Sequence, residues 1–340
     1  MVQFSPLEYR RKNRRELIKK SVVAVASVTF ALLAGELAVR AFDLAPEIYL
    51  AQRGRFRLSE NPLLGYETVP HFKSETDGPF FDYAGRSNSL GFRDREHPVV
   101  KPEGVQRILV LGDSITQGYM VTEAEDIFTA VLERRLQNTG RDVEVLNFGV
   151  NGYDSRQQIE TLREHGLAFA PDLVVVAYCI NDNYIDSGGI HATLLLEKER
   201  HREHFRLPAA LTKSALGRLI WTYLYHRGIP PADVPSTVPT NISHELVPAA
   251  FADLRSMADD GGFQVLVAIF PELNNLKVGL KQPWVPEVEE IAAAAGFTTY
   301  DLTEDLLACD LERSVVFDTL HPNAYGHACV GEALARSLLE

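Results

Sequence analysis

The chain has 340 residues, of which 46% are hydrophobic and 24% charged, and a formal net charge of −12. These values are typical of a globular protein with a sizeable core, in one or two domains. The first 20 residues carry seven Lys or Arg and two Asp or Glu, which leaves −17 on the rest. Such an acidic body argues against nucleic acid as a partner, because phosphate binding needs a basic surface.

The basic residues 1–20 precede a mostly apolar stretch, residues 21–42. Two interpretations stay open: a cleaved signal peptide followed by secretion, or an uncleaved single-pass anchor. The stretch is close to a bilayer span in length and lacks a clean Ala-x-Ala cleavage site, which favours the anchor. The positive-inside rule then puts residues 1–20 in the cytoplasm and the body outside, periplasmic or extracellular. Glu36 lies toward the outer end, where its carboxylate could reach the interface.

Residues 43–105 are rich in aromatic residues, proline, glycine and charge. This composition predicts a connector of short extended pieces and turns. We expect it to pack on the body rather than to fold alone.

From residue 106 to residue 340, short apolar runs alternate with amphipathic segments. This alternation predicts an α/β domain with a parallel sheet and helices on both faces. Residues 185–240 interrupt the rhythm and are interpreted as an insertion, a candidate lid. The expected strands are 107–112, 142–149, 171–180, 263–270 and 297–303, and the expected helices are 122–138, 155–169, 245–260 and 323–340.

The three cysteines, Cys179, Cys309 and Cys329, are odd in number and widely spaced. No CxxC pair occurs, so we expect all three to be free and structural rather than part of a zinc site or a disulfide framework. The "HREH" run at 201–204 matches no metal-binding motif, and neither a metal nor a cofactor is expected.

Polar motifs follow the predicted strands where ligands bind in a parallel sheet, beyond the carboxyl ends. "GDS" (112–114) ends the first strand, "NFGVNG" (147–152) the second and "CINDN" (179–183) the third, and "DTLHP" (318–322) precedes the last helix. We therefore expect these four segments to meet at one edge of the sheet.

Together these residues have the chemistry of an activated serine. A serine hydroxyl needs a base, and His321 is the candidate for Ser114. Asp318, three residues earlier, can accept the other imidazole N–H and fix the tautomer. The backbone N–H groups of Ser114 and Gly152 and the side-chain amide of Asn181 would stabilise an oxyanion.

Other polar residues near these motifs have subsidiary expected roles. Asp113 is expected to cap the turn after the strand. Asn151, Tyr153 and Gln157 are candidates for lining the substrate pocket.

The four motifs resemble, in order and approximate position, the sequence blocks of the GDSL/SGNH hydrolase family, over about residues 105–340. The resemblance implies a flavodoxin-like three-layer α/β/α sandwich of five parallel strands. It also implies Ser114 as nucleophile, Asp318 and His321 as the rest of a triad, and Gly152 and Asn181 as oxyanion donors with the Ser114 amide.

The sequence departs from the family pattern at Ile115, where the family has leucine, and at Cys179, where its third block has glycine. The connector segment "NSLGFRDREHP" (88–98) is similar to membrane-anchored or exported members.

The function expected from these residues is hydrolysis of an ester-bearing small molecule, lipid or glycan through an acyl-enzyme. Two alternatives remain: an extracytoplasmic O-acyltransferase acting on a glycan, and a catalytically silent SGNH-like polysaccharide-binding module. A silent module would be expected to have lost part of the triad, and Ser114, Asp318 and His321 are all present.

Overall fold

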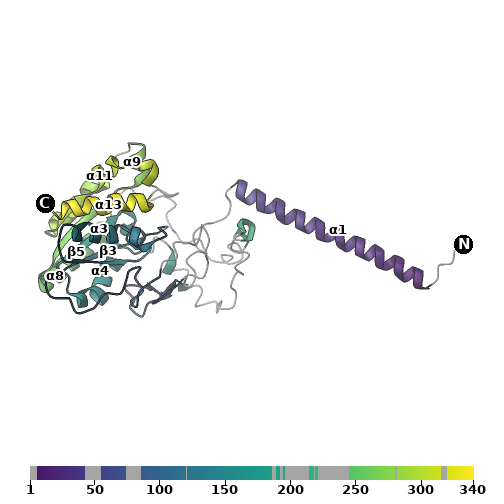
Figure 1. The fold of residues 1–340 in the computed structure, drawn as a ribbon, viewed down its shortest axis with the longest axis horizontal. Helices are drawn as coiled ribbons and strands as arrows, with labels where there is room; N and C mark the ends of the chain where they lie inside the picture. The colour runs from purple at the N-terminus through teal and green to yellow at the C-terminus, as the bar shows by residue number, and fades with distance from the viewer. Residues whose placement is uncertain are drawn as a thin grey trace. The chain divides into compact units, whose positions relative to one another are not determined.

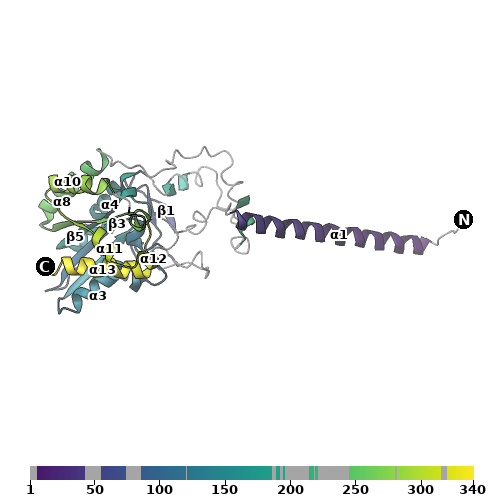
Figure 2. The same cartoon turned by 90° about the horizontal axis from the view of Figure 1, so that it is seen from above.

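A computed structural model describes residues 6–42, 55–73, 86–119, 121–185, 189–191, 194–195, 214–217, 219–220, 245–279, 282–314 and 320–340. The chain divides into two compact units (Figures 1 and 2). The smaller unit comprises Met1–Ala51 with Glu203–Pro230, and the larger comprises Gln52–Arg202 with Pro231–Glu340. Asp318 and most of the predicted insertion lie outside the described residues.

The smaller unit is dominated by the helix α1, Pro6–Ala41. Its section Ile18–Ala41, 24 residues long, is apolar and long enough to cross a membrane. Only 6% of its most apolar 18-residue stretch is buried. A helix of this kind near the N-terminus is consistent with a signal sequence or an anchor.

The larger unit contains a five-stranded sheet in the order β4-β3-β5-β6-β7, in which every pair of neighbours is parallel. The predicted parallel α/β architecture is therefore confirmed. The strands run over Gln106–Gly112 (β3), Val143–Gly149 (β4), Leu173–Cys179 (β5), Gln264–Phe270 (β6) and Thr298–Asp301 (β7).

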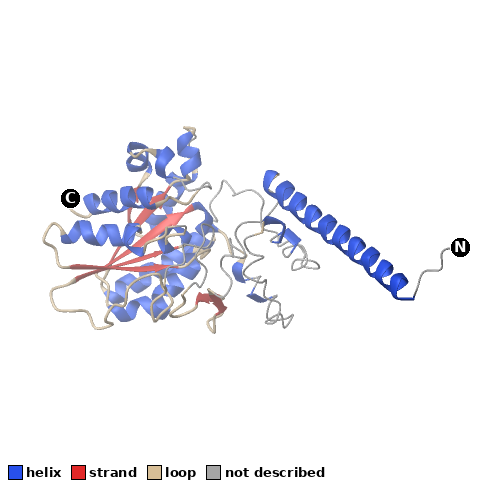
Figure 3. Cartoon of the chain, turned by 45° about the vertical axis from the view of Figure 1, so that its right-hand side comes forward, coloured by secondary structure: helices blue, strands red, loops and turns tan. Residues whose placement is uncertain are grey.

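Helices cover both faces of this sheet (Figure 3). Alternate residues of β3 enter two separate cores: Leu109 and Leu111 join one, and Ile108 and Val110 join the other. The first core is closed by α4, α8 and α10, and the second by α3, α11 and α13. The helices are α2 (Ser114–Gln117), α3 (Phe128–Gln137), α4 (Ser155–Thr161), α8 (Leu246–Gly261), α9 (Leu273–Lys277), α10 (Trp284–Ala294), α11 (Thr303–Ala308), α12 (Leu311–Ser314) and α13 (Ala324–Ser337).

The connector contributes to the first core. Its hairpin of β1 (Phe56–Leu58) and β2 (Tyr66–Thr68) is antiparallel. Phe56, Tyr66 and Phe92 are buried in the same cluster as the sheet residues, and the Phe92 ring stacks on Phe148 of β4 at 4.2 Å between centroids. This segment is thus part of the body around the sheet.

The cysteine prediction is wrong for two of the three residues. Cys309, which follows α11, forms a disulfide with Cys329 of α13, 20 residues later. The two helices lie against the same face of the sheet, and the Cα atoms of the two cysteines are 6.6 Å apart. Their spacing along the chain carries no sign of this packing. Cys179 is free and buried, as expected.

His327 of α13 is a completely buried histidine in the second core. Its Nδ1 accepts a hydrogen bond from the backbone N–H of Phe128 at 3.2 Å, and its ring stacks on the Phe128 ring. Burial, and then the charges of Arg93 and His321, lower the pKa of His327 to about 3. The folded chain therefore holds His327 neutral at pH values where the unfolded chain would protonate it.

This burial predicts acid sensitivity. As the pH falls below the ordinary histidine value, only the unfolded state gains this proton, so stability falls by about 1.4 kcal/mol per pH unit from this group. In His327→Asn the amide oxygen can still accept from Phe128, and the proton site is gone. Urea unfolding at pH 7.5 and pH 5 should show a smaller acid loss for the variant, by about 2 kcal/mol. Equal losses in the two proteins would contradict this account.

Candidate active site

Strand β3 ends in glycine because the short helix α2 packs directly against its end. A Cβ added at Gly112 would lie 2.0 Å from Oγ1 of Thr116, and one at Gly149 would lie 2.3 Å from the backbone nitrogen of Gln117. Neither strand end can carry a side chain while α2 stays in place. Asp113 caps α2, as expected, by accepting the backbone N–H of Ile115 at 2.9 Å. The sheet edge thus fixes the position of the first helical residue, Ser114.

The structure brings Ser114 and His321 together across 207 residues of sequence. Nε2 of His321 lies 2.7 Å from Oγ of Ser114. Ser114 is 5% exposed. The segment bearing His321 leads into α13, whose first turn is capped by Asn323 through its side-chain oxygen. A hydroxyl beside an imidazole at this distance is the arrangement of a nucleophile and its general base.

The ring of Tyr119 packs on the imidazole of His321, with 4.5 Å between the two centroids. Tyr119 belongs to the loop after α2 and is 6% exposed. Arg93 of the connector is buried beneath this loop. Its guanidinium donates to the carbonyl oxygens of Gly118, Val121 and Thr122. The connector therefore holds the loop that carries the aromatic neighbour of His321.

Sequence reasoning missed both residues. The "GFR" segment that ends in Arg93 carries only a family likeness, and a lone arginine gives no sign of which carbonyl groups it binds. The signal for Tyr119 in the sequence is an aromatic residue five positions after Ser114.

The Asp113 carboxylate connects Ser114 to the turn that follows β5. Its Oδ2 lies 3.1 Å from Oγ of Ser114 and accepts a hydrogen bond from Nδ2 of Asn181 at 2.6 Å. Ser114 has one hydroxyl proton, and the imidazole nitrogen is the nearer acceptor. The Asn181 amide uses one of its two N–H groups on Asp113. Asp113 therefore holds Asn181 beside Ser114.

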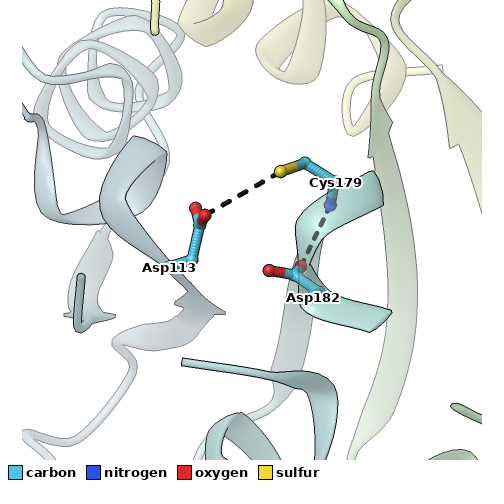
Figure 4. A group of neighbouring side chains, drawn as sticks. All are labelled: Asp113, Cys179 and Asp182. Atoms are coloured by element: carbon cyan, nitrogen blue, oxygen red, sulfur yellow. Dashed lines mark hydrogen bonds between the residues drawn. The ribbon is translucent and has the colours of Figure 1, made fainter. Parts of the chain in front are cut away.

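Cys179, at the family's glycine position, takes part in the same network (Figure 4). Its thiol lies 3.8 Å from Oδ2 of Asp113 and also contacts Oδ1 of Asn181. Asp182, in the 3₁₀ turn Ile180–Asn183 after β5, accepts the backbone N–H of Cys179 at 3.0 Å. Here the cysteine side chain adds a polar contact that glycine cannot make.

Burial decides the charge of this cluster. Burial, followed by the charge of Asp113, raises the pKa of both Cys179 and Asp182 well above their ordinary values. The Cys179 thiol therefore keeps its proton at neutral pH, and burial shifts Asp182 toward its neutral form. Their ligand atoms and those of Asp113 lie within 4.8 Å of one another, close enough for a metal ion. The raised pKa values favour protonated forms, which are poor metal ligands, and the hydrogen bonds around Asp113 favour a positioning network over a metal centre.

The remaining candidates divide into two groups. Gly152 lies in the turn after β4 with a φ of 78°, a conformation that suits glycine, and Asn151 beside it is 9% exposed. The side chains of Tyr153 and Gln157 are buried and point to the connector. Tyr153 donates its hydroxyl to the carbonyl of Tyr66, and Gln157 donates to the carbonyl of Leu64 at 2.6 Å. Both side chains thus bind backbone carbonyl groups of the connector, and the pocket-lining role expected for them stays a prediction.

Comparison with known families agrees with this geometry. Residues 110–329, more than half of the chain, match the GDSL-like Lipase/Acylhydrolase family. The chain belongs to this family. The matched region contains Ser114 and His321, and the resemblance drawn from the sequence motifs is confirmed. The GDSL-like Lipase/Acylhydrolase family is a family of ester hydrolases. No curated protein matches the chain.

Several solved structures are similar to this GDSL-like chain. They include a two-domain esterase active on acetylated mannans (17% identity, TM-score 0.45), a lipase/acylhydrolase from Enterococcus faecalis (20%, 0.42) and an acetyl xylan esterase (14%, 0.43). In the same order, the matched regions cover 69%, 68% and 68% of this chain. They cover 49%, 95% and 99% of the three solved chains. The chain thus spans about half the length of the two-domain esterase.

Proposed function

We propose that the protein is a serine-dependent ester hydrolase that works through an acyl-enzyme. The observation that carries this proposal is the 2.7 Å contact between Oγ of Ser114 and Nε2 of His321. Ser114 is the nucleophile, and His321 is its base. Asp318 is proposed as the third member of the triad, accepting the Nδ1 proton of His321.

In the acylation step, His321 takes the hydroxyl proton as Ser114 Oγ attacks the ester carbonyl carbon. The tetrahedral intermediate collapses when the bond to the alcohol oxygen breaks, and His321 returns the proton to that oxygen. Water then enters, gives a proton to His321 and attacks the acyl carbon. The acid leaves and Ser114 regains its proton.

The oxyanion of each intermediate needs fixed donors. We assign the backbone N–H groups of Ser114 and Gly152 and the Asn181 amide to this role. The hydrogen bond from Asn181 to Asp113 supports the assignment, because it locks the amide beside the nucleophile and leaves its second N–H to donate. This account gives Asp113 and Cys179 the task of holding the donor in place.

The substrate is proposed to be an ester-bearing small molecule, lipid or glycan. A sugar hydroxyl that enters in place of water would make the same acyl-enzyme an O-acyltransferase. The two chemistries share every step up to the acyl-enzyme, so the nature of the acceptor decides between them.

We propose that the catalytic domain lies outside the cytoplasm, anchored by α1. The Cys309–Cys329 disulfide supports this location, because such bonds form and persist in oxidising compartments. The basic residues before the apolar helix support the same orientation.

Loss of the nucleophile should abolish turnover. In Ser114→Ala, kcat for p-nitrophenyl acetate should fall by a factor on the order of 10⁴ or more, and His321→Ala should cost nearly as much because the two act as a unit. The matched control, Ser89→Ala, changes an exposed serine and should leave kcat unchanged. Full activity in Ser114→Ala with an intact fold would overturn the proposed mechanism.

The oxyanion assignment is tested at Asn181. Asn181→Ala should lower kcat by about 10²–10³ with little change in KM, because the amide stabilises charge that develops only in the transition state. Asn138→Ala, an exposed amide at the end of α3, is the control. A kcat within a factor of about two of the parent would remove Asn181 from the mechanism.

A further inference from the structure

The apolar helix α1 makes a specific polar contact with a distant part of the chain. The Glu36 carboxylate accepts hydrogen bonds from the hydroxyl of Ser214 at 2.7 Å and from the backbone N–H groups of Ala215 and Leu216 at 2.9 and 2.8 Å. Residues 215–217 and 219–220 are helical. Glu36 therefore caps a helical turn that lies about 180 residues further along the chain, inside the predicted insertion.

Apolar packing surrounds this cap. Val39 and Ala215 are buried against each other, at 5% and 2% exposure, with Leu216 and Leu219 packed beside them. Gly35 allows the close approach, since a Cβ at this position would lie 3.0 Å from Cδ2 of Leu216. The contact combines charge, backbone hydrogen bonds and side-chain packing on one face of α1.

The position of Glu36 along α1 makes this contact significant. Ile18–Ala41 is 24 residues long, or about 36 Å at 1.5 Å per residue, against a hydrocarbon core of about 30 Å. Glu36 lies five residues before the end, about 8 Å from it along the axis. A carboxylate near the outer boundary of a bilayer is costly unless it is paired. Arg40, at 2.7 Å, and the three donors from residues 214–216 supply that pairing.

We propose that residues 214–220 of the insertion dock on the outer end of a retained membrane helix, within the interfacial layer of the outer leaflet. The inference rests on the proposed location of the protein. A cleaved signal sequence would be lost together with Glu36 and all of these contacts, so the docking requires that α1 stay attached.

The bilayer is the partner of the apolar side chains left uncovered by the docking. Leu37 is 69% exposed, Phe42 74% and Ile220 48%. The sequence continues past Ile220 with Trp221, Tyr223 and Tyr225, residue types that are enriched at membrane interfaces. The insertion would therefore give the hydrolase a second attachment to the lipid surface, besides the anchor.

The test is cross-linking in membranes that hold the full chain, tagged at its N-terminus. Gly35→Cys is combined with Leu216→Cys, and a protease site is introduced within residues 77–83, between the two cysteines. After oxidation and cleavage, the N-terminal fragment should stay joined to the rest on a non-reducing gel. The control pairs Leu37→Cys with Leu216→Cys. Leu37 lies about 200° around the helix from Gly35, so it should give at least a tenfold lower yield.

Glu36→Leu removes the cap and should reduce the cross-link several-fold, with turnover of a soluble ester unchanged. Loss of the N-terminal tag from the mature chain would overturn the proposed retention of α1. A retained tag without the Gly35–Leu216 link, in chains that still hydrolyse ester, would overturn the docking alone. Should the cysteine pair fail to fold, benzoylphenylalanine at position 219 must capture an α1 peptide on irradiation, and its failure to do so counts against the docking. Neither result bears on the ester chemistry, which turnover reports separately.

Discussion

The site depends on the close seating of α2 on the ends of two parallel strands. Gly112 and Gly149 have no room for a Cβ, because Thr116 and Gln117 occupy that space. Asn147 of β4 strengthens the seat by donating to the carbonyl of Thr116 at 2.7 Å. With α2 fixed in this way, Ser114 has one position relative to the sheet, and His321 can be placed against it by a segment from the far end of the chain. If α2 packed less closely on the strand ends, the 2.7 Å distance between Nε2 of His321 and Oγ of Ser114 would vary. Positioning errors of this kind lower catalytic rates.

Around α2, several polar groups hold one another in place. Asp113 caps α2, contacts Oγ of Ser114 and accepts a hydrogen bond from the Asn181 amide. In the turn after β5, Asp182 accepts the backbone N–H of Cys179, whose thiol contacts Asn181. Burial raises the pKa values of Cys179 and Asp182, which favours their neutral forms and lowers the cost of burying the cluster. Arg93 holds the loop that bears Tyr119, through hydrogen bonds to three of its carbonyl groups. The connector thus contributes to the order of the site without supplying a reacting group.

Much of this arrangement could be predicted from the sequence. Apolar runs that alternate with amphipathic segments predict a parallel sheet. Because the carboxyl ends of parallel strands meet at one edge, Ser114, Asn181 and Gly152 are expected there together. The remainder depends on packing that no local pattern encodes. The Cys309–Cys329 pair forms because α11 and α13 cover the same face. Tyr153 and Gln157 turn inward because the connector offers them the carbonyl groups of Tyr66 and Leu64. Glu36 is unusual in an apolar helix, but its partners lie about 180 residues away in the sequence.

The central claim is that His321 makes Ser114 a nucleophile. The most direct measurement is labelling of the full chain with a fluorophosphonate, followed by peptide mapping, in the parent and in His321→Ala. The account predicts one label per chain, on Ser114, and labelling slowed by orders of magnitude without the imidazole. A chain that is folded yet unlabelled, labelled on another residue, or labelled equally fast without His321 would contradict it.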